Sequence, residues 1–253
     1  MGRNVLISGA SHGIGAATAI AFAKDGCNVG INYHNNRAGA EETAAECRKY
    51  GVDAQIYCAD IGCREQAVGM RRDFIEHFGT VDVLINNAGC GYLGRMGETE
   101  TAVQTRMVDL NVRAMTAMTN LVIPYMPAGG RILNTSSIAS FCPTPRMTVY
   151  GASKAYVSSF TVGLSEELKR RDITVTAVCP GPMKTEFLDV GSITGRSPAF
   201  EYLPYCDQVR VAAGALRAAK AGRTMYTPRL FYKFYRLLAK VTPVKLMVKF
   251  TKT

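Results

Sequence analysis

The chain begins with an apolar strand that runs into a glycine-rich turn and then into a helix. Residues 5–8 form the predicted strand, Gly9, Gly13 and Gly15 mark the turn, and residues 16–24 are predicted to be helical. Glycine permits a tight turn and close approach of the backbone to a pyrophosphate, and the free amides at the helix start, around Ile14 and Gly15, attract its charge. A strand, a glycine turn and a helix in this order are typical of a dinucleotide-binding site.

The alternation of strand and helix continues along the chain. Predicted strands lie at residues 5–8, 28–33, 54–57, 81–85, 131–135, 174–178 and 224–226, with helical stretches between them. This pattern is typical of a parallel sheet that is covered by helices on both faces. A chain of 253 residues can bury one ample core, and no linker, repeat or low-complexity stretch divides it. The sequence therefore predicts a single-domain α/β fold with a doubly wound, Rossmann-type parallel sheet of about seven strands.

A serine, a tyrosine and a lysine stand at a spacing that suits the reduction of a ketone. Tyr150 follows Ser137 by 13 residues, and Lys154 follows Tyr150 by four. If Tyr150 opens a helix, Lys154 lies one turn further on the same face. A tyrosine with its ordinary pKa of about 10 is a poor acid or base at neutral pH. A cation nearby stabilises the phenolate and lowers the pKa, so Tyr150 is predicted to be a general acid/base.

Three further motifs accompany these residues. They are Asn-Asn-Ala-Gly at residues 86–89, Leu-Asn-Val around Asn111, and Pro-Gly-Pro-Met-Lys-Thr at residues 180–185. The glycine spacing is GxxxGxG, which differs from the general GxGxxG fingerprint. Together with Ser137 and the YxxxK pair, these motifs resemble the short-chain dehydrogenase/reductase family, and the resemblance covers nearly the whole chain.

The resemblance implies four catalytic residues. Ser137 would hydrogen-bond the substrate oxygen, and Tyr150 would be the general acid/base. Lys154 would hold the nicotinamide ribose and lower the tyrosine pKa, while Asn111 would hold a water that links the lysine to solvent. Ser136 is the neighbouring candidate for the serine role, but the family pattern favours Ser137. The hydride itself moves on the cofactor, and the protein contributes orientation and electrostatics.

The end of the second predicted strand favours NADP(H) over NAD(H). Tyr33 stands where the family's NAD enzymes carry an aspartate, and the next acid along the chain is Glu41. A 2′-phosphate would meet no repulsion there, and His34 and Arg37 could donate hydrogen bonds to it. Asp60 matches the family's adenine-binding aspartate, although it could also cap the following helix. The predicted cofactor-binding residues are Gly9, Ser11, His12, Gly13, Ile14, Gly15, Tyr33, His34, Arg37, Asp60, Ile61, Asn87, Ala88, Gly89, Tyr150, Lys154, Pro180, Gly181, Met183 and Thr185.

The predicted substrate cleft is apolar and adaptable. Besides Ser137 and Tyr150, its candidate lining residues are Tyr92, Phe141, Met147 and Phe187. By the resemblance, residues 183–205 form a lid over the substrate. Such a pocket suits a sterol, bile-acid, acyl or aromatic ketone better than a sugar. The sequence thus predicts an NADP(H)-dependent oxidoreductase that interconverts a secondary alcohol and a ketone. The alternatives are a 3-oxoacyl thioester reductase and, in another class, a binding protein that senses the nicotinamide cofactor without turnover.

The positive charge is concentrated at the C-terminus. Residues 1–207 carry 19 Lys and Arg against 20 Asp and Glu, whereas residues 208–253 carry 11 Lys and Arg and no acid. We divide the chain into a catalytic part, residues 1–228, and a basic amphipathic extension, residues 229–253. The extension could dock on the protein itself or on a partner subunit, or bind anionic lipid at a membrane surface. Nucleic acid is not expected, because no motif that reads it accompanies the basic helix.

The remaining expectations concern assembly and compartment. The resemblance implies a homodimer or homotetramer formed through the helices at residues 102–125 and 150–171. No apolar run is long enough to cross a bilayer, and the N-terminus reads as a strand rather than a signal peptide. The eight cysteines show no metal-binding spacing, so free thiols and no metal site are expected. We expect a cytoplasmic protein that could be peripheral at the membrane.

Overall fold

Seven parallel strands form one sheet in the computed structural model, which describes residues 2–193, 200, 202–249 and 251. The order across the sheet is β3-β2-β1-β4-β5-β6-β7, and every neighbouring pair is parallel. The strands are β1 (Asn4–Ile7), β2 (Asn28–Tyr33), β3 (Ala54–Cys58), β4 (Val83–Asn86), β5 (Arg131–Thr135), β6 (Thr174–Val178) and β7 (Met225–Tyr226). The strand order reverses between β1 and β4, which is where ligands bind in sheets of this kind. The predicted fold class is confirmed.

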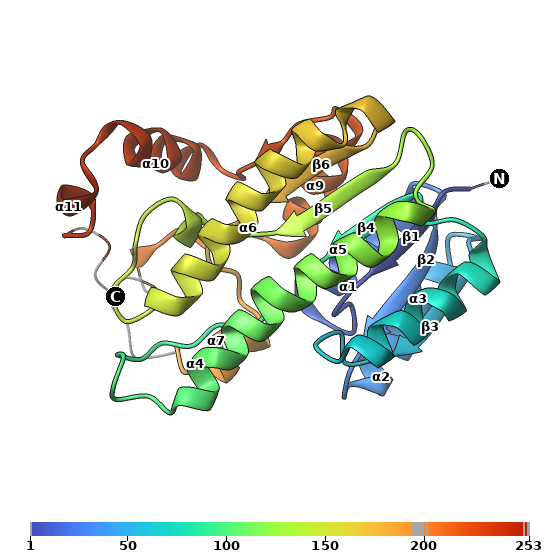
Figure 1. The fold of residues 1–253 in the computed structure, drawn as a ribbon, viewed down its shortest axis with the longest axis horizontal. Coiled ribbons are helices and arrows are strands. Elements are labelled where there is room, and N and C mark those ends of the chain that lie inside the picture. Colours follow the sequence, from blue (N-terminus) through green and yellow to red (C-terminus); the bar gives the residue numbers. More distant parts are fainter. Residues whose placement is uncertain (1, 194–199, 201, 250, 252–253) are drawn as a thin grey trace.

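Helices cover both faces of the sheet (Figure 1). One layer holds α1 (Gly13–Lys24), α2 (Arg37–Arg48) and α9 (Gln208–Lys220); the other holds α3 (Arg64–Phe78), α5 (Met115–Val122) and α6 (Thr148–Glu167). Alternate residues of β1 point to opposite faces, so Val5 and Ile7 belong to one buried core and Leu6 to the other. The two cores explain why the central strands are mostly apolar, because neither side of these strands faces solvent.

The helix predicted at residues 102–125 is interrupted in its middle. It consists of α4 (Thr101–Val108), a π-helical segment (Asp109–Ala114), α5 and a 3₁₀ turn (Ile123–Tyr125). The π-helical segment contains Asn111, and such segments occur frequently at functional sites. The helix predicted at residues 150–171 is α6 followed by a second 3₁₀ turn (Lys169–Arg171).

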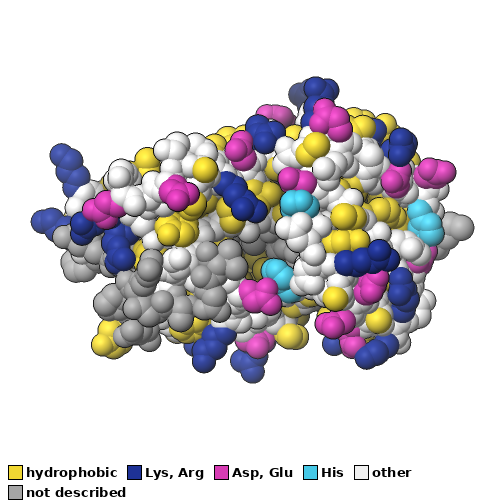
Figure 2. All heavy atoms as spheres, turned by 90° about the horizontal axis from the view of Figure 1, so that it is seen from below, with side chains coloured by type: hydrophobic (Ala, Val, Ile, Leu, Met, Phe, Trp, Pro, Cys, Tyr) yellow, Lys and Arg dark blue, Asp and Glu magenta, His cyan; other side chains and the backbone are white. Residues whose placement is uncertain are grey.

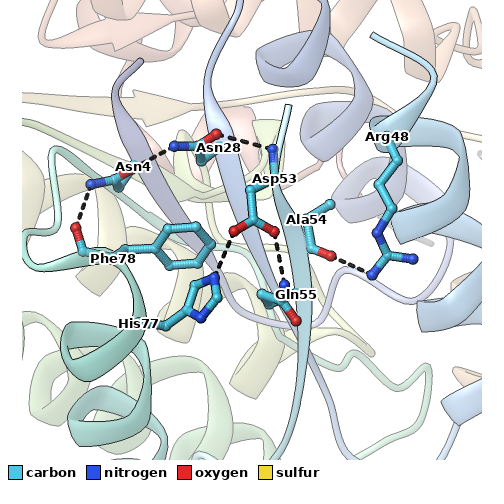
Figure 3. Close-up of polar contacts among 8 residues, drawn as sticks. All are labelled: Asn4, Asn28, Arg48, Asp53, Ala54, Gln55, His77 and Phe78. Carbon is cyan, nitrogen blue, oxygen red and sulfur yellow. Dashed lines mark hydrogen bonds and ion pairs between the residues drawn. The ribbon is translucent and has the colours of Figure 1, made fainter. Parts of the chain in front are cut away.

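A polar network holds the amino ends of β1, β2 and β3 together (Figure 3). Asn28 Nδ2 donates to Asn4 Oδ1 over 3.0 Å, and Asn28 Oδ1 accepts from the Asp53 amide over 3.0 Å. Asn4 Nδ2 donates to the Phe78 carbonyl at the end of α3, over 2.9 Å. His77 Nε2 lies 2.6 Å from Asp53 Oδ2. The network links the amino ends of these strands and so helps to align their carboxyl ends at one edge of the sheet.

The C-terminal extension forms two helices at one end of the molecule, far from the N-terminus (Figure 1). They are α10 (Leu230–Val241) and α11 (Val244–Met247). A short helix, α7 (Glu186–Val190), follows β6, and a 3₁₀ turn (Ile138–Ser140) follows β5. None of the helices in the described part of the chain has the length and hydropathy needed to cross a bilayer. All eight cysteines lie among the described residues and are free thiols.

Candidate active site

The loops at the carboxyl ends of the strands surround a cavity of about 1440 Å³. Its walls come from the loops after β1 to β6 and from the C-terminal extension. Figure 2 shows a hollow near the middle of the molecule, with histidine and acidic side chains beside it. Polar loop residues line one part of the cavity and apolar side chains line the other, which is the composition of a site for a polar cofactor and an apolar substrate.

The glycine turn lies directly against the end of β4. A Cβ atom on Gly15 would collide with the Gly9 carbonyl oxygen and the Asn87 side-chain amide, so only glycine fits there. Asn87 Nδ2 donates to the carbonyls of Ser8 and Gly9 over 3.1 and 2.7 Å, which ties the turn to β4. Helix α1 begins at Gly13, so its first amides have no partner within the helix. This cradle fits the pyrophosphate of a dinucleotide.

The predicted catalytic serine and tyrosine are in contact. The Ser137 hydroxyl forms a hydrogen bond with Tyr150, and Ser137 Oγ also accepts from the Ala139 amide over 3.2 Å. Ser136 faces a different way, because its hydroxyl donates to the Lys154 carbonyl and bonds Ser158. Ser137 is therefore the serine that reaches the cavity beside Tyr150.

Lys154 lies one helical turn beyond Tyr150, as the spacing predicts. Its Nζ is 5.8 Å from the centroid of the Tyr150 ring and donates to the Thr135 carbonyl over 2.8 Å. Both side chains are buried and both line the cavity. The carbonyl at the end of β5 thus holds the ammonium below the phenol.

Burial changes both pKa values. It raises the pKa of Tyr150 to about 12, against the opposing effect of the hydrogen bond with Ser137. It lowers the pKa of Lys154 to about 8. The direction for Tyr150 is opposite to the lowering that the sequence predicted, because desolvation of the buried phenolate is the largest effect on its pKa. At neutral pH the tyrosine is a proton donor and the lysine is largely protonated.

Asn111 stands behind the lysine. Its Oδ1 accepts from the Cys90 amide over 2.9 Å, and its Nδ2 donates to the Cys90 carbonyl over 2.8 Å and to Ser153 Oγ over 3.0 Å. A Cβ atom on Gly89 would lie 2.9 Å from Asn111 Oδ1 and 3.3 Å from Lys154 Nζ. The side-chain amide of Asn111 thus clamps the loop after β4 against α6, and all four predicted catalytic residues lie together.

The end of β2 carries no acid toward the cavity. Tyr33 and His34 line the cavity there. Arg37 does not line it, because its guanidinium is exposed and its Nε donates to Glu41 over 2.8 Å. Asp60 lines the cavity and accepts from the Gly62 amide over 2.8 Å, whereas α3 begins only at Arg64. Asp60 therefore caps a turn rather than the helix.

The other predicted site residues fall into two groups. Those that line the cavity are Gly9, Ser11, His12, Gly13, Ile14, Gly15, Ile61, Asn87, Ala88, Gly89, Met147, Pro180, Gly181, Met183, Thr185 and Phe187. Tyr92 and Phe141 lie outside its wall. The Phe141 ring packs instead against Tyr235 of α10, with 6.2 Å between centroids.

The region predicted to form a lid is described in part. Within residues 183–205, residues 194–199 and 201 lie outside the described part of the chain. The Phe187 ring of α7 lies 5.6 Å from the Tyr150 ring. His12 Nε2 in the glycine turn lies 3.6 Å from Glu186 Oε2, so α7 contacts both the catalytic tyrosine and the glycine turn.

The cavity wall also contains residues that the sequence reasoning did not select. They are Arg106, Asp109 and Arg113 around the π-helical segment, and Phe231, Tyr232, Tyr235, Leu238, Thr242, Leu246, Met247 and Thr251 in the C-terminal extension. The spacing of Tyr232, Tyr235 and Leu238 places them on one side of α10 and could have indicated the face that lines the cavity. The sequence analysis instead interpreted the basic residues of this helix, and did not predict that the helix lines the cavity.

Fold and site together define a nicotinamide-dependent oxidoreductase of the doubly wound α/β class. The family model of the short chain dehydrogenases matches residues 3–194. The chain belongs to this family of NAD(P)-dependent dehydrogenases and reductases.

Individual relatives agree with this assignment. The chain is 34% identical over 205 residues to versicolorin reductase of Emericella nidulans, covering 80% of this chain and 75% of that protein. It is 33% identical over 194 residues to the 3-oxoacyl-[acyl-carrier-protein] reductase of Staphylococcus aureus, covering 75% and 78%. A short chain dehydrogenase of Burkholderia cenocepacia, solved in complex with NADP, superposes with a TM-score of 0.81 at 29% identity, covering 90% and 96%.

Proposed function

We propose that the protein is an NADP(H)-dependent oxidoreductase that interconverts a secondary alcohol and a ketone on an apolar substrate. The observation that carries this proposal is the hydrogen-bonded pair of Ser137 and Tyr150 above the buried Lys154 at the cavity wall. These three groups can hold a carbonyl oxygen and give it a proton. A nicotinamide cofactor supplies the hydride when bound.

In the direction of ketone reduction, Ser137, Tyr150 and Lys154 have different roles. The Ser137 hydroxyl donates a hydrogen bond to the carbonyl oxygen and orients it toward Tyr150. The Tyr150 phenol, which burial keeps protonated at neutral pH, passes its proton to that oxygen as negative charge develops there. Lys154 below the ring stabilises the phenolate that remains. Oxidation of the alcohol reverses these steps and starts from the phenolate, which the raised pKa makes scarce.

The preference for NADP(H) follows from the chemistry at the end of β2. Tyr33, His34 and Asn35 line this part of the cavity, and none of them is acidic. Arg37 forms an exposed ion pair with Glu41, and solvent weakens such pairs, so the guanidinium can turn toward a phosphate. The similar Burkholderia enzyme was solved with NADP, which supports the same preference here.

The cofactor preference is tested by comparing kcat/KM for NADPH and NADH. We expect NADPH to be preferred, and Tyr33→Asp to lower kcat/KM for NADPH by about tenfold or more, because a carboxylate repels the 2′-phosphate. A wild-type preference for NADH would contradict the proposal.

The reaction is tested with a panel of sterol, bile-acid, aromatic and 3-oxoacyl thioester ketones. We expect NADPH oxidation that disappears in Tyr150→Phe, a variant that retains the ring but loses the proton donor. The apolar groups around Tyr150, including Met147, Phe187 and Leu93, favour an apolar ketone. Turnover restricted to the thioesters would favour the second candidate, the activity named for the Staphylococcus relative. Unchanged turnover in Tyr150→Phe would refute the role of the tyrosine.

We also propose that the outward face of α10 binds an anionic membrane surface. An outer stripe of Leu230, Phe234, Leu237 and Val241 is 81%, 66%, 58% and 72% exposed. Exposed Lys233 and Lys240 flank the stripe, and positively charged side chains gather at the left end of Figure 2, where α11 lies in Figure 1. An apolar face beside lysines, in a region without acids, is complementary to anionic lipid.

Vesicle sedimentation tests this surface. We expect the protein to sediment with vesicles of phosphatidylserine and phosphatidylcholine, and less with phosphatidylcholine alone. Leu237→Asp should abolish sedimentation, whereas Val209→Asp, at a 64% exposed position on α9, should not. Oligomerisation that requires Leu237, without any vesicle binding, would show that a second copy covers the stripe and would overturn the proposal.

The assembly that we propose is a homodimer or homotetramer through the α4–α5 and α6 helices. Val108, Tyr125, Tyr156 and Val162 are large apolar residues on these elements that remain 38–47% exposed. Such side chains favour a partner surface. Light scattering of the wild type and Val162→Glu tests this arrangement, and a monomeric wild type would contradict it.

A further inference from the structure

The cavity continues beyond the catalytic residues into the C-terminal extension. From Tyr150 it runs past Met147 and Thr144 to side chains of α10, α11 and Thr251. The volume of about 1440 Å³ includes both the dinucleotide cradle and this part next to the extension. Helices α10 and α11 lie at the left of the molecule in Figure 1, whereas β2, whose end contributes to the dinucleotide cradle, lies at the right.

The extension is fixed at both of its ends. At the start of α10, Tyr232 is completely buried, its ring lies against Gly181, and its hydroxyl donates to the Pro204 carbonyl over 2.8 Å. At the other end Met247 is 4% exposed, and Thr251 Oγ1 donates to the Pro143 carbonyl over 2.8 Å. These anchors make α10 and α11 a wall of the cavity rather than a detached tail.

The middle of this wall is apolar. Tyr235 lies between the anchors with its ring against Phe141, and Leu238 follows one turn later. The side chains that the extension contributes to the cavity are aromatic, aliphatic, thioether or hydroxyl groups, and none of the described ones is charged. All lysines and arginines of α10 except Arg236 are exposed on the rest of the helix. A wall of this composition favours an alkyl or fused-ring group over a charged one.

We infer that α10, α11 and Thr251 form the far wall of the substrate site, and that Tyr235, Leu238 and Met247 select ketones that carry an extended apolar group. The inference rests on the proposed ketone reduction and names its substrate class. The carbonyl lies at Ser137 and Tyr150, and the apolar group of the substrate runs past Met147 toward α10. The outer stripe lies on a different side of the same helix, so α10 contributes one face to the substrate site and another face to the outer stripe.

A homologous series of methyl ketones tests the wall by activity. From 2-butanone to 2-dodecanone, kcat/KM with NADPH should rise by roughly fourfold per added methylene until the wall is reached, since each buried methylene contributes about 0.8 kcal/mol. Leu238→Trp should lower the ratio of kcat/KM for 2-dodecanone to that for 2-butanone by about tenfold or more. The matched control is Leu237→Trp, because the neighbouring side chain points outward and does not line the cavity. An unchanged ratio in Leu238→Trp, or an equal loss in both variants, would overturn the inference.

Fluorescence provides a second readout that does not depend on turnover. The chain contains no tryptophan, so Tyr235→Trp introduces the only tryptophan of the variant into the wall, and its emission can be excited selectively. In the presence of NADP⁺, 2-dodecanone should shift its emission to shorter wavelength and saturate, whereas Leu237→Trp should not respond. A shift without wild-type turnover would refute the proposed reaction and leave the wall intact. Turnover of 2-dodecanone without a shift in Tyr235→Trp would refute the wall and leave the reaction intact.

Discussion

Replacing Lys154 with methionine should make the folded chain less sensitive to pH, at the cost of activity. Lys154 is buried, and its pKa is lowered from 10.5 to about 8. Each unit of pKa corresponds to about 1.4 kcal/mol, so the protonated lysine destabilises the fold by about 3 kcal/mol at pH 7. Methionine removes this penalty but leaves the Thr135 carbonyl without its donor, which costs about 1–3 kcal/mol. At pH 7 the net effect is therefore a stabilisation of about 0–2 kcal/mol.

The pH dependence separates the two effects. Between the folded and unfolded pKa values of Lys154 the unfolded chain binds more protons, so the stability of the wild type rises with pH in this window. The loss at Thr135 is independent of pH. The free energy of unfolding of Lys154→Met minus that of the wild type should therefore fall by about 2–3 kcal/mol between pH 7 and pH 10.

Urea unfolding followed by circular dichroism at pH 7, 8, 9 and 10 measures this difference. Tyr150 does not disturb the comparison, because its pKa of about 12 keeps the phenol of the folded wild type protonated up to pH 10, and loss of the Lys154 charge can only raise that pKa. Lys169→Met, at an exposed lysine after α6, is the control and should show no such trend. A difference between wild type and Lys154→Met that stays constant from pH 7 to pH 10 would refute the argument that burial discharges Lys154.

Three further outcomes are expected. The rate of ketone reduction should fall as the pH rises through about 8, because Lys154 then loses the charge that stabilises the Tyr150 phenolate. A pH profile of kcat measures this, and a rate that increases across this range would contradict the mechanism. Gly181→Ala should release α10, because the Cβ atom of the alanine would collide with the Tyr232 ring. Trypsin should then cleave after Lys233 faster than in the wild type. Equal cleavage would mean that the contact between Gly181 and Tyr232 does not hold the extension. His77→Gln should cost about 0.2–1 kcal/mol of unfolding free energy at pH 7. Burial of Asp53 opposes ionisation, but hydrogen bonds from His77 and Gln55 hold its pKa below the usual value. The extra stability of the wild type over His77→Gln should therefore be lost as the pH falls through that pKa. If acid unfolding curves show that the wild type remains more stable, the pairing of His77 with Asp53 is refuted.

Local sequence signals identified most of the fold. The predicted strands agree with the observed ones within two residues at each end. The reason is that the strands are buried, so each appears in the sequence as a short apolar run bounded by polar turns. The π-helical segment around Asn111 was not foreseen. The wider turn of this segment accompanies the clamp between Asn111 and the loop after β4, and that loop is distant in sequence.

Most of the candidate site could also be predicted from the sequence. The glycine turn and the spacing of Tyr150 and Lys154 are local patterns, and the structure places them where the patterns predict. The direction of the Tyr150 pKa was not predictable, because it depends on how far Phe187, Met147 and their neighbours exclude water. Arg37 was selected by its charge and position, but its ion pair with Glu41 turns it away from the cavity.

In the C-terminal extension the sequence predicts the faces of the helices, and long-range packing determines which face is buried. Its amphipathic periodicity and its excess of lysine and arginine are visible in the sequence, because residues three and four apart share a side of a helix. Which side is buried depends on partners far along the chain. Tyr232 is buried because Gly181 leaves room for its ring, and Thr251 is held by the Pro143 carbonyl. Periodicity specifies the faces of a helix, whereas long-range packing determines which face lines the cavity and which remains in solvent.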